Sequence, residues 1–270
     1  MHYVPTSSGA AWFKACGEVQ AFEPRLSAAL YSRWPDRVGA VIAHDEERRW
    51  LLLDDAGRPA EVFGDRVDVW PQVLPLYAEL QRGEVAHARS HVAHGVPDLR
   101  VEALPERYGQ LLDRPDLPLD PDEMRRLHVF APRFAALCDE LAAHALPATI
   151  QHDDLHYANV YARGSALRVL DWGDASVGHP FASLVVTFRF LEQRDGVAPG
   201  DPLFARLRDA YLEPWGEGLG DAFELAMRVG SFALAIAWLR QRDFLAGDAR
   251  DAFDHWFPAV VRRALARADA

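Results

Sequence analysis

The chain has 270 residues, of which 50% are hydrophobic and 26% are charged. This composition supports a large buried core and excludes both a small disulfide-dependent domain and a wholly disordered protein. The 29 basic and 40 acidic residues give a net charge of −11, which argues against nucleic acid or an anionic membrane as a partner. Cys16 and Cys138 are the only cysteines, a number typical of a reducing cytoplasm and too small for a cysteine metal cage.

The sequence lacks the patterns of secretion and of a membrane span. Residues 1–14 have no positive region followed by a continuous apolar core, as a secretory signal would. The longest apolar run, at residues 232–239, is well short of the roughly 20 residues that a membrane-spanning helix needs. We therefore expect a cytoplasmic protein with no membrane partner, and we interpret the apolar run as a buried helix.

Strand-like segments and one helix make up residues 10–56. Pro24 occupies a first-turn position of the predicted helix, and Pro35 ends it. Between them, apolar residues recur at helical spacing. The predicted strands are short and rich in aromatic, β-branched or apolar residues, and they lie at 11–15, 38–43 and 49–53.

Long amphipathic helices follow this first region. The clearest begins at Asp120, with Pro121 at the first helical position and Glu123 at the third, and its apolar residues recur every three or four positions. We predict an α+β protein with a small lobe over residues 1–57 and a mostly helical large lobe over residues 58–270. Further helices are predicted at 69–89, 202–213, 221–242 and 252–266, and short strands at 148–151, 159–161 and 167–170.

The most informative stretch contains Gln-His-Asp-Asp-Leu-His-Tyr-Ala-Asn at residues 151–159 and Val-Leu-Asp-Trp-Gly-Asp at residues 169–174. Asn159 and Asp171 lie at the ends of short predicted strands, so a tight hairpin would bring them side by side. Amide and carboxylate oxygens are ligands that Mg²⁺ accepts, while the phosphates of a substrate supply others. Asp154 then remains free to orient and deprotonate an attacking hydroxyl group.

This pattern resembles the catalytic and metal loops of the aminoglycoside phosphotransferase and choline kinase-like family, relatives of the protein kinases. The resemblance implies a two-lobed, protein kinase-like fold and ATP-dependent transfer of the γ-phosphoryl group to a hydroxyl of a small molecule. It implies that Asp154 is the catalytic base and that Asn159 and Asp171 bind Mg²⁺. His152 and His156 would support the loop rather than react. The family motif, His-x-Asp-Leu-His-x-x-Asn followed by Asp-Trp, is matched by His152, Asp154, Leu155, His156, Asn159, Asp171 and Trp172.

The resemblance extends in outline to the small lobe. Lys14 is similar to the family lysine that binds the α- and β-phosphates of ATP, and Glu23 is similar to its ion-pair partner. Residues 50–55 resemble the hinge beneath the adenine. Because only thirteen residues precede Lys14, we expect the phosphate-covering glycine hairpin to be missing, with residues 7–9 as a turn into the lysine strand. Ser183 stands where many relatives have a carboxylate.

Two other interpretations stay open. Without the hairpin, the chain could be a kinase-like nucleotide-binding protein that has lost turnover. Alternatively, His152 and His156 could belong to a metal-dependent hydrolase that takes further ligands from His87, His91 and His94. The sequence carries no signal for the identity of the acceptor or for an oligomeric state. Three tryptophans are interpreted as core residues rather than as substrate platforms: Trp172, Trp238 and Trp256.

Overall fold

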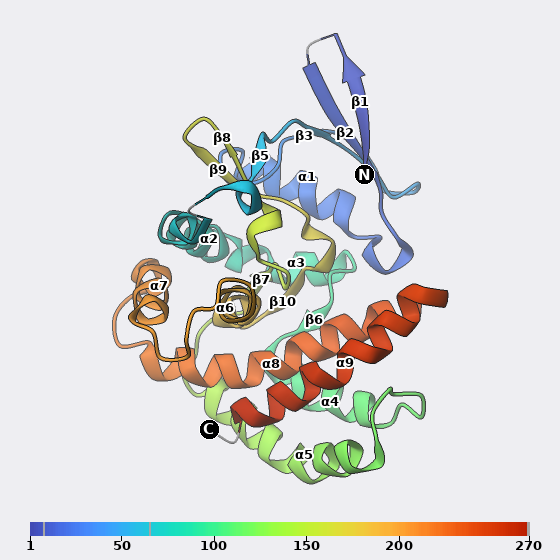
Figure 1. Cartoon of the computed structure of the whole chain (residues 1–270), viewed down its shortest axis with the longest axis vertical. Helices are drawn as coiled ribbons and strands as arrows, with labels where there is room; N and C mark the ends of the chain where they lie inside the picture. Colours follow the sequence, from blue (N-terminus) through green and yellow to red (C-terminus); the bar gives the residue numbers. More distant parts are fainter. Residues whose placement is uncertain (8, 65, 269–270) are drawn as a thin grey trace.

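The computed structural model describes residues 1–7, 9–64 and 66–268. Figure 1 shows a small lobe, built on a sheet and one helix, above a larger and mostly helical lobe, as predicted. The small lobe contains β1 (His2–Thr6), β2 (Gly9–Ala15), α1 (Glu23–Arg33), β3 (Val41–Asp45) and β4 (Trp50–Asp54). The rest of the chain contains β5 (Arg58–Pro59), α2 (Trp70–Glu84), α3 (Ala88–Ala93), β6 (Asp98–Leu99), α4 (Leu104–Leu112), α5 (Pro121–Ala142), β7 (Thr149–Gln151), β8 (Val160–Arg163), β9 (Ala166–Val169), β10 (Ser176–Gly178), α6 (Leu184–Arg194), α7 (Pro202–Leu212), α8 (Gly220–Arg242) and α9 (Gly247–Ala268).

The sheet of the small lobe is antiparallel, with the strand order β1-β2-β4-β3. Lys14 lies on β2 opposite Leu51 of β4, so its side chain starts from the middle of the sheet. Within the described part of the chain, the strand β1 precedes the lysine strand, and the two form a hairpin. This hairpin was not predicted, because we expected the hairpin that covers the phosphates to be missing. Of the turn predicted at residues 7–9, Ser8 lies outside the described residues, and Gly9 begins β2.

The strand predicted at residues 38–43 begins later than expected, at Val41. Val38 pairs instead with Val169 of the large lobe. The backbone amide of Val169 also donates to the carbonyl of Arg37 at 2.8 Å. The segment before β3 is therefore held by the large lobe rather than by the sheet, and it joins the two lobes.

The helices of the large lobe bury the apolar faces that their periodicity predicts. α5 begins at the predicted capping box, in which Asp120 accepts from the Glu123 amide at 2.8 Å and the Glu123 carboxylate accepts from the Asp120 amide at 3.0 Å. α8 is long and apolar enough to cross a membrane, but most of it is buried inside the protein. The apolar run at residues 232–239 belongs to this helix, which confirms the prediction of a buried core helix.

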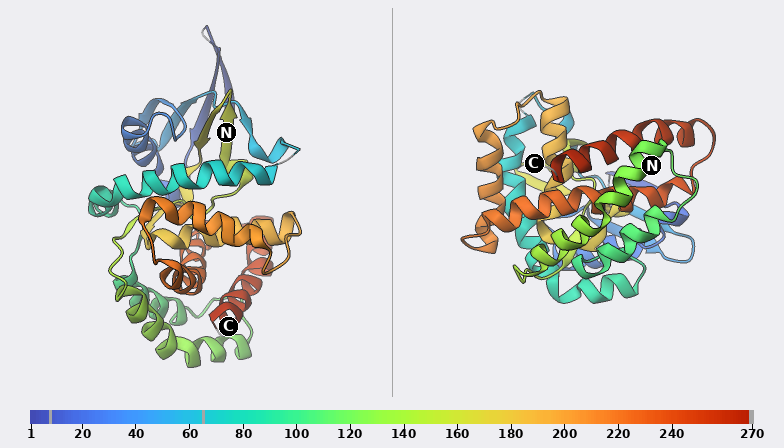
Figure 2. Two further views of the ribbon diagram at one scale, coloured as in Figure 1. Left: turned by 90° about the vertical axis from the view of Figure 1, so that its left-hand side faces the viewer. Right: turned by 90° about the horizontal axis from the view of Figure 1, so that it is seen from below.

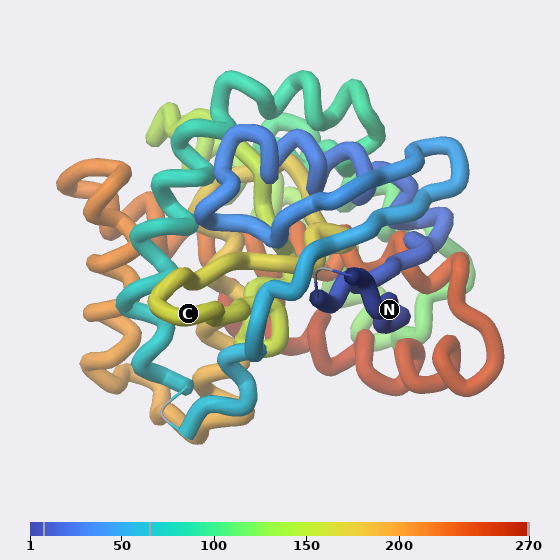
Figure 3. Tube along the Cα trace, turned by 90° about the horizontal axis from the view of Figure 1, so that it is seen from above, coloured from blue at the N-terminus to red at the C-terminus, as the bar shows by residue number. Residues whose placement is uncertain are grey.

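Two short sheets position the segment that carries the motif. β10 pairs with β6 and β7, whereas β8 pairs with β5 and β9. Figure 3 shows the β8–β9 hairpin, in yellow, beside the chain that leaves the small lobe. The loop between β7 and β8 and the segment after β9 therefore lie at the junction of the two lobes.

The α1 and α2 helices hold the lobes together. Figure 2 shows α2 crossing the molecule between the small lobe and the C-terminal helices. The carboxylate of Glu84, at the end of α2, is fully buried and accepts two hydrogen bonds from Arg33, at 2.7 and 2.6 Å. It also accepts from Trp34 Nε1 at 2.7 Å and bonds to His91 Nε2 at 2.7 Å. We refer to Glu84, Arg33, Trp34 and His91 as the Glu84 cluster.

Candidate active site

The loop between β7 and β8 holds Asp154 in a fixed hydrogen-bonded setting. His156 Nδ1 accepts from the backbone amide of Ala158 at 3.2 Å, so His156 Nε2 carries the proton and donates to Asp154 Oδ2 at 3.2 Å. Asn159 Nδ2 donates to the Asp154 carbonyl at 2.8 Å and to Oδ2 at 3.3 Å. Asp154 thus keeps one carboxylate oxygen, Oδ1, directed away from these donors. Its side chain is 28% exposed, which leaves it accessible to an acceptor.

His152 braces this loop from inside the protein. Its ring is fully buried, and Nε2 bonds to the carbonyl oxygen of Leu170 at 2.8 Å. The ring also packs against Trp172, with ring centroids 4.9 Å apart. Trp172 is buried, as predicted, and donates to the carbonyl of Val169. These contacts join the loop that carries Asp154 to the segment that contains Asp171.

Asn159 precedes β8 and Asp171 follows β9, so both residues lie at the open end of the β8–β9 hairpin. Val160 pairs with Val169, and the Leu170 amide donates to the Asn159 carbonyl at 2.9 Å. Asp171 follows directly, with φ of 65°, a left-handed conformation that is uncommon for a residue other than glycine. The sequence prediction that a tight hairpin places these two residues together is consistent with this geometry.

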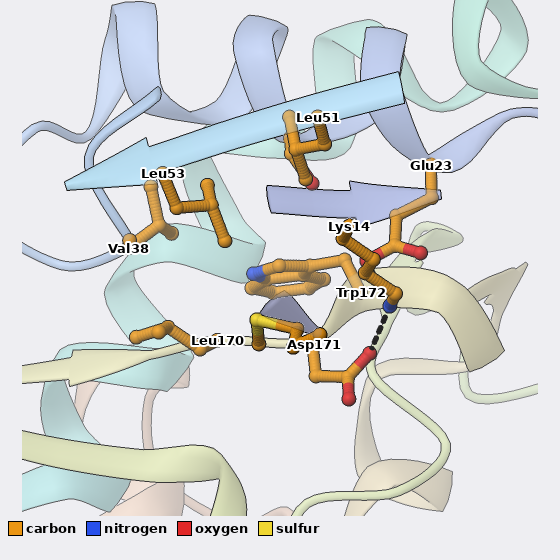
Figure 4. Close-up of a pocket in the computed structure, with 11 residues that line it drawn as sticks. Lys14, Glu23, Val38, Leu51, Leu53, Leu170, Asp171 and Trp172 are labelled. Carbon is orange, nitrogen blue, oxygen red and sulfur yellow. Dashed lines mark hydrogen bonds and ion pairs between the residues drawn. The ribbon is translucent and has the colours of Figure 1, made fainter. Parts of the chain in front are cut away.

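Lys14 links the small lobe to Asp171 of the large lobe. Its Nζ lies 2.7 Å from Glu23 Oε1 and 2.6 Å from Asp171 Oδ1, and Figure 4 shows the lysine and Asp171 side chains pointing toward each other. Burial would lower the pKa of Lys14, but the carboxylates of Glu23 and Asp171 outweigh burial and raise it above its ordinary value. The lysine is therefore fully charged at neutral pH.

A cavity with apolar walls lies between the lobes next to this ion pair. Lys14 and Asp171 stand at one side of it. Figure 4 shows side chains from the small-lobe sheet above the cavity and from the segment after β9 below it. The cavity has a volume of only about 10 Å³, enough for about one water molecule, so a flat apolar group could bind between these walls only after the lobes move apart. The apolar residues that line the cavity are Val38, Leu51, Leu53 and Leu170.

Asp174 is a further carboxylate that the sequence did not single out. Burial, together with the nearby charges of Asp154 and Asp171, raises the pKa of Asp174 to about 7. The side-chain amide of Gln241, near the end of α8, donates to this carboxylate. Its position three residues after Asp171 could have drawn attention to it. Its contact with α8 could not be predicted, because nothing in the local sequence indicates it.

Ser183, which stands where many relatives have a carboxylate, belongs to a buried hydrogen-bonded group that supports the loop between β7 and β8. Ser183 Oγ bonds to the Tyr77 hydroxyl at 2.7 Å, accepts from Gln81 Nε2 at 3.1 Å and donates to the Gln151 side-chain oxygen. The Tyr77 hydroxyl accepts from the backbone amide of His152 at 3.0 Å. Ser183 therefore reaches the loop through neutral hydroxyl and amide groups.

Comparison with known families identifies the reaction class. A family model described as "Phosphotransferase enzyme family" matches residues 44–224, more than half of the chain. The chain belongs to this phosphotransferase family. The matched range contains Asp154, Asn159 and Asp171, whereas Lys14 and Glu23 precede it.

Solved structures of other phosphotransferases share the fold of this one. Choline kinase LicA from Streptococcus pneumoniae has a TM-score of 0.63 at 12% identity, covering 98% of this chain and 88% of LicA. Macrolide 2'-phosphotransferase MphH from Brachybacterium faecium has a TM-score of 0.62 at 18% identity, covering 96% of this chain and 86% of MphH. Aminoglycoside 2'-phosphotransferase-IIIa has a TM-score of 0.57 at 14% identity, covering 92% of this chain and 82% of its own. No curated protein sequence matches the chain.

Membership of the phosphotransferase family replaces the hydrolase interpretation of the histidines. His91, one of the ligands considered for a hydrolase metal, is buried and bonded to Glu84. His156 orients Asp154, and its ring stacks on Phe190 with centroids 4.5 Å apart. These histidines support the phosphotransferase fold through hydrogen bonds and packing.

Proposed function

We propose that this phosphotransferase binds ATP between its lobes and uses Asp154 to direct a hydroxyl group of a small molecule at the γ-phosphate. One observation carries the proposal: Lys14 of the small lobe lies 2.6 Å from Asp171 of the large lobe, beside a cavity with apolar walls. In ATP-dependent phosphoryl transfer, a lysine and a metal-binding carboxylate act on the same phosphates. Their side chains therefore have to meet at one point.

The nucleotide would lie with its adenine between the apolar walls, once the lobes move apart to widen the cavity, and with its phosphates at Lys14. Glu23 holds the lysine from the other side, so the ammonium group is directed toward the cleft. Before phosphates bind, Asp171 takes their place as the partner of Lys14. We infer that ATP binding exchanges this partner, which leaves the Asp171 carboxylate free for a cation.

Asn159 and Asp171 fit a magnesium ion by their chemistry. The amide nitrogen of Asn159 donates to Asp154. The oxygen of the same amide is therefore the atom that would bind a cation. Lys14 bonds to Oδ1 of Asp171, and the backbone amide of Gly173 also donates to this carboxylate. One amide and one carboxylate oxygen suit Mg²⁺, which takes further ligands from phosphates and water. When bound, Mg²⁺ would offset the negative charge of the transferring phosphoryl group.

Asp154 would orient the acceptor and receive its proton. The hydrogen bonds from His156 and Asn159 fix the carboxylate by one oxygen, Oδ2, and leave Oδ1 for the hydroxyl group. A base placed in this way contributes about 10²- to 10⁴-fold to the rate. We place this chemistry in the cytoplasm, where ATP is available and where the buried free thiols of Cys16 and Cys138 stay reduced.

An acceptor screen with purified protein tests the proposal. ADP formation is followed with Mg²⁺, ATP and a panel of amino sugars, amino alcohols, polyols and nucleosides, and the thermal shift with ATP is measured with and without Mg²⁺. We expect a magnesium-dependent shift and ADP formation that requires Asp154. A shift without turnover on any acceptor would instead favour a nucleotide-binding protein that has lost activity.

A further inference from the structure

Three arginines meet in a groove between α6, α8 and α9. Arg189 comes from α6, and Arg263 and Arg267 come from α9, and together they line a small cavity closed by α8. Among the described residues, no carboxylate oxygen lies within 4.0 Å of any of these three guanidinium groups. Arg263 donates to the side-chain oxygen of Gln193, which is an uncharged partner. Glu192 of α6 lines the same groove, and its charge, with that of Glu224, acts on Arg267. In a protein with a net charge of −11, three arginines against this one lining carboxylate still give the groove a local positive charge, centred on Arg189 and Arg263.

Arg189 is the least satisfied of the three. Its guanidinium carbon lies 4.6 Å from the ring centroid of Trp238 and 5.9 Å from that of Trp256. Its Nε is buried and has no hydrogen-bond partner. Burial and the charge of Arg263 lower the pKa of Arg189 to about 10. A guanidinium that is desolvated without a carboxylate loses stability that a bound anion would restore.

Arg189 is connected to the proposed base, Asp154, through its charge and through its neighbour in α6. The negative charge of Asp154 acts on it and partly opposes the effect of burial. The neighbouring residue in α6, Phe190, stacks on His156, and His156 donates to Asp154. Arg189 is therefore one residue along α6 from the side chain that packs against the His156–Asp154 pair.

Arginines on the opposite face of α8 do not share this excess charge. They line a cavity of about 420 Å³ between β6, α4 and the end of α8. Arg114 forms two hydrogen bonds with Asp243 there, at 2.5 and 3.0 Å. Arg240 faces the charges of Asp153 and Asp174. Arg107 also lines this cavity and bonds to the uncharged side chain of Gln110. Because Arg114 is paired with a carboxylate and Arg240 faces two of them, we assign no anion to that cavity.

We propose that the phosphate acceptor carries an anionic group, a carboxylate or a phosphate ester, that binds Arg189 at the start of the α6–α9 groove. This inference rests on the function proposed above. An anionic acceptor would be repelled by both the Asp154 carboxylate and the phosphates of ATP, and Arg189 supplies the opposite charge at that point. Charged hydrogen bonds from a planar guanidinium suit both carboxylate and phosphate groups.

The experiment compares acceptors that differ in charge. Glycerol, glycerate, glycerol 3-phosphate and choline are supplied with Mg²⁺ and ATP, and kcat and KM are measured for the wild type, Arg189→Gln, Arg189→Lys and Arg206→Gln. Arg206 is an exposed arginine of α7, so its variant removes the same charge elsewhere. In parallel, with an ATP analogue and Mg²⁺ saturating the nucleotide site, the thermal shift with inorganic phosphate or acetate is compared with chloride at equal ionic strength.

We expect kcat/KM for glycerate or glycerol 3-phosphate to exceed that for glycerol and choline at least tenfold. Arg189→Gln should raise KM for the anionic acceptor at least tenfold, Arg189→Lys less, and Arg206→Gln should match the wild type. If Arg189 binds a carboxylate, Arg189→Gln should weaken the binding of glycerate and acetate. If it binds a phosphate ester, the variant should weaken the binding of glycerol 3-phosphate and inorganic phosphate.

Three results would overturn the inference. The first is a preference for glycerol or choline, and the second is an anion-induced thermal shift that Arg189→Gln retains. The third is an equal loss of kcat for every acceptor in Arg189→Gln, which would mean that Arg189 acts on the transferring phosphoryl group. Failure of the proposed function looks different, because it leaves no ADP formation with any acceptor and no magnesium-dependent nucleotide shift.

Discussion

At the scale of single residues, Asp154 is the sharpest test of the site. Replacing it with Asn removes the base but keeps the shape of the side chain, so we expect kcat to fall by about 10²- to 10⁴-fold. ATP affinity, measured by calorimetry, should change little because Asp154 contacts His156 and Asn159 rather than Lys14. Asp139→Asn, on the exposed face of α5, serves as the control. A variant at Asp154 with more than half of the wild-type turnover would refute its role.

Asp171 should behave differently from Asp154. Asp171→Asn removes the proposed anionic metal ligand, so the thermal shift with ATP should lose its dependence on Mg²⁺, and turnover should fall with it. Lys14→Met provides the comparison: it should weaken ATP binding, since it removes the charge that faces the phosphates, but it should keep the magnesium dependence. Identical magnesium titrations for Asp171→Asn and the wild type would exclude Asp171 as a ligand.

At the scale of the elements, Gly83 sets how closely α1 approaches α2. A Cβ on Gly83 would lie 2.2 Å from Cζ2 of Trp34, which is part of the Glu84 cluster. We expect Gly83→Ala to lower the free energy of unfolding by about 1 to 3 kcal/mol, measured by urea denaturation. Gly109→Ala, in α4, is matched to it because a Cβ there meets nothing within 4 Å. That variant should gain roughly 0.5 to 1 kcal/mol from helix propensity, and equal effects of the two variants would contradict the close contact.

The sequence predicts best those elements whose determining residues lie close together along the chain. The capping box at Asp120 and the hairpin between Asn159 and Asp171 arise from residues within a dozen positions of each other, and both could be read directly. The contact of Lys14 with Asp171 joins distant parts of the chain, and only the family resemblance suggested it. Glu84 gave no signal, because its partners come from α1 and α3.

The tryptophans show the same limit of local patterns. Trp172 and Trp238 are buried, as predicted. Trp256 is 37% exposed, so its interpretation as a core residue was wrong. Helical periodicity correctly turns Trp256 toward Trp238, 4.8 Å away between ring centroids, but it cannot show that the groove beside α6 leaves the outer part of the ring uncovered.

At the scale of the whole molecule, the Glu84 cluster makes the stability of the contact between the lobes depend on pH. Burial would raise the pKa of Glu84, but hydrogen bonds from His91, Arg33 and Trp34 outweigh burial and lower the pKa to about 2. A carboxylate whose pKa is lower in the folded state stabilises the fold above its unfolded pKa, near 4.3, and this stability is lost as the pH falls toward 2. The full effect is on the order of 3 kcal/mol.

Glu84→Gln should therefore flatten the decline of unfolding free energy between pH 5 and pH 3, measured by urea denaturation at each pH. The variant should also be less stable than the wild type at pH 7, because Arg33 loses its charged partner. Glu79→Gln, on the half-exposed surface of the same helix, should keep the wild-type slope. Parallel curves for Glu84→Gln and the wild type would show that acid acts elsewhere.

The two ends of α1 have different partners, so a small rotation of the helix about one end would move the other end. Its last turn is held at the Glu84 cluster, whereas its first residue, Glu23, holds Lys14 at the mouth of the cleft. Glu23 and Arg33 are the first and last of the eleven residues of α1, so roughly 15 Å of helix separates them. A tilt of about 10° around the Arg33 end would move the Glu23 end by roughly 3 Å. This movement is large enough to separate Lys14 from Asp171 while Arg33 stays bonded to Glu84.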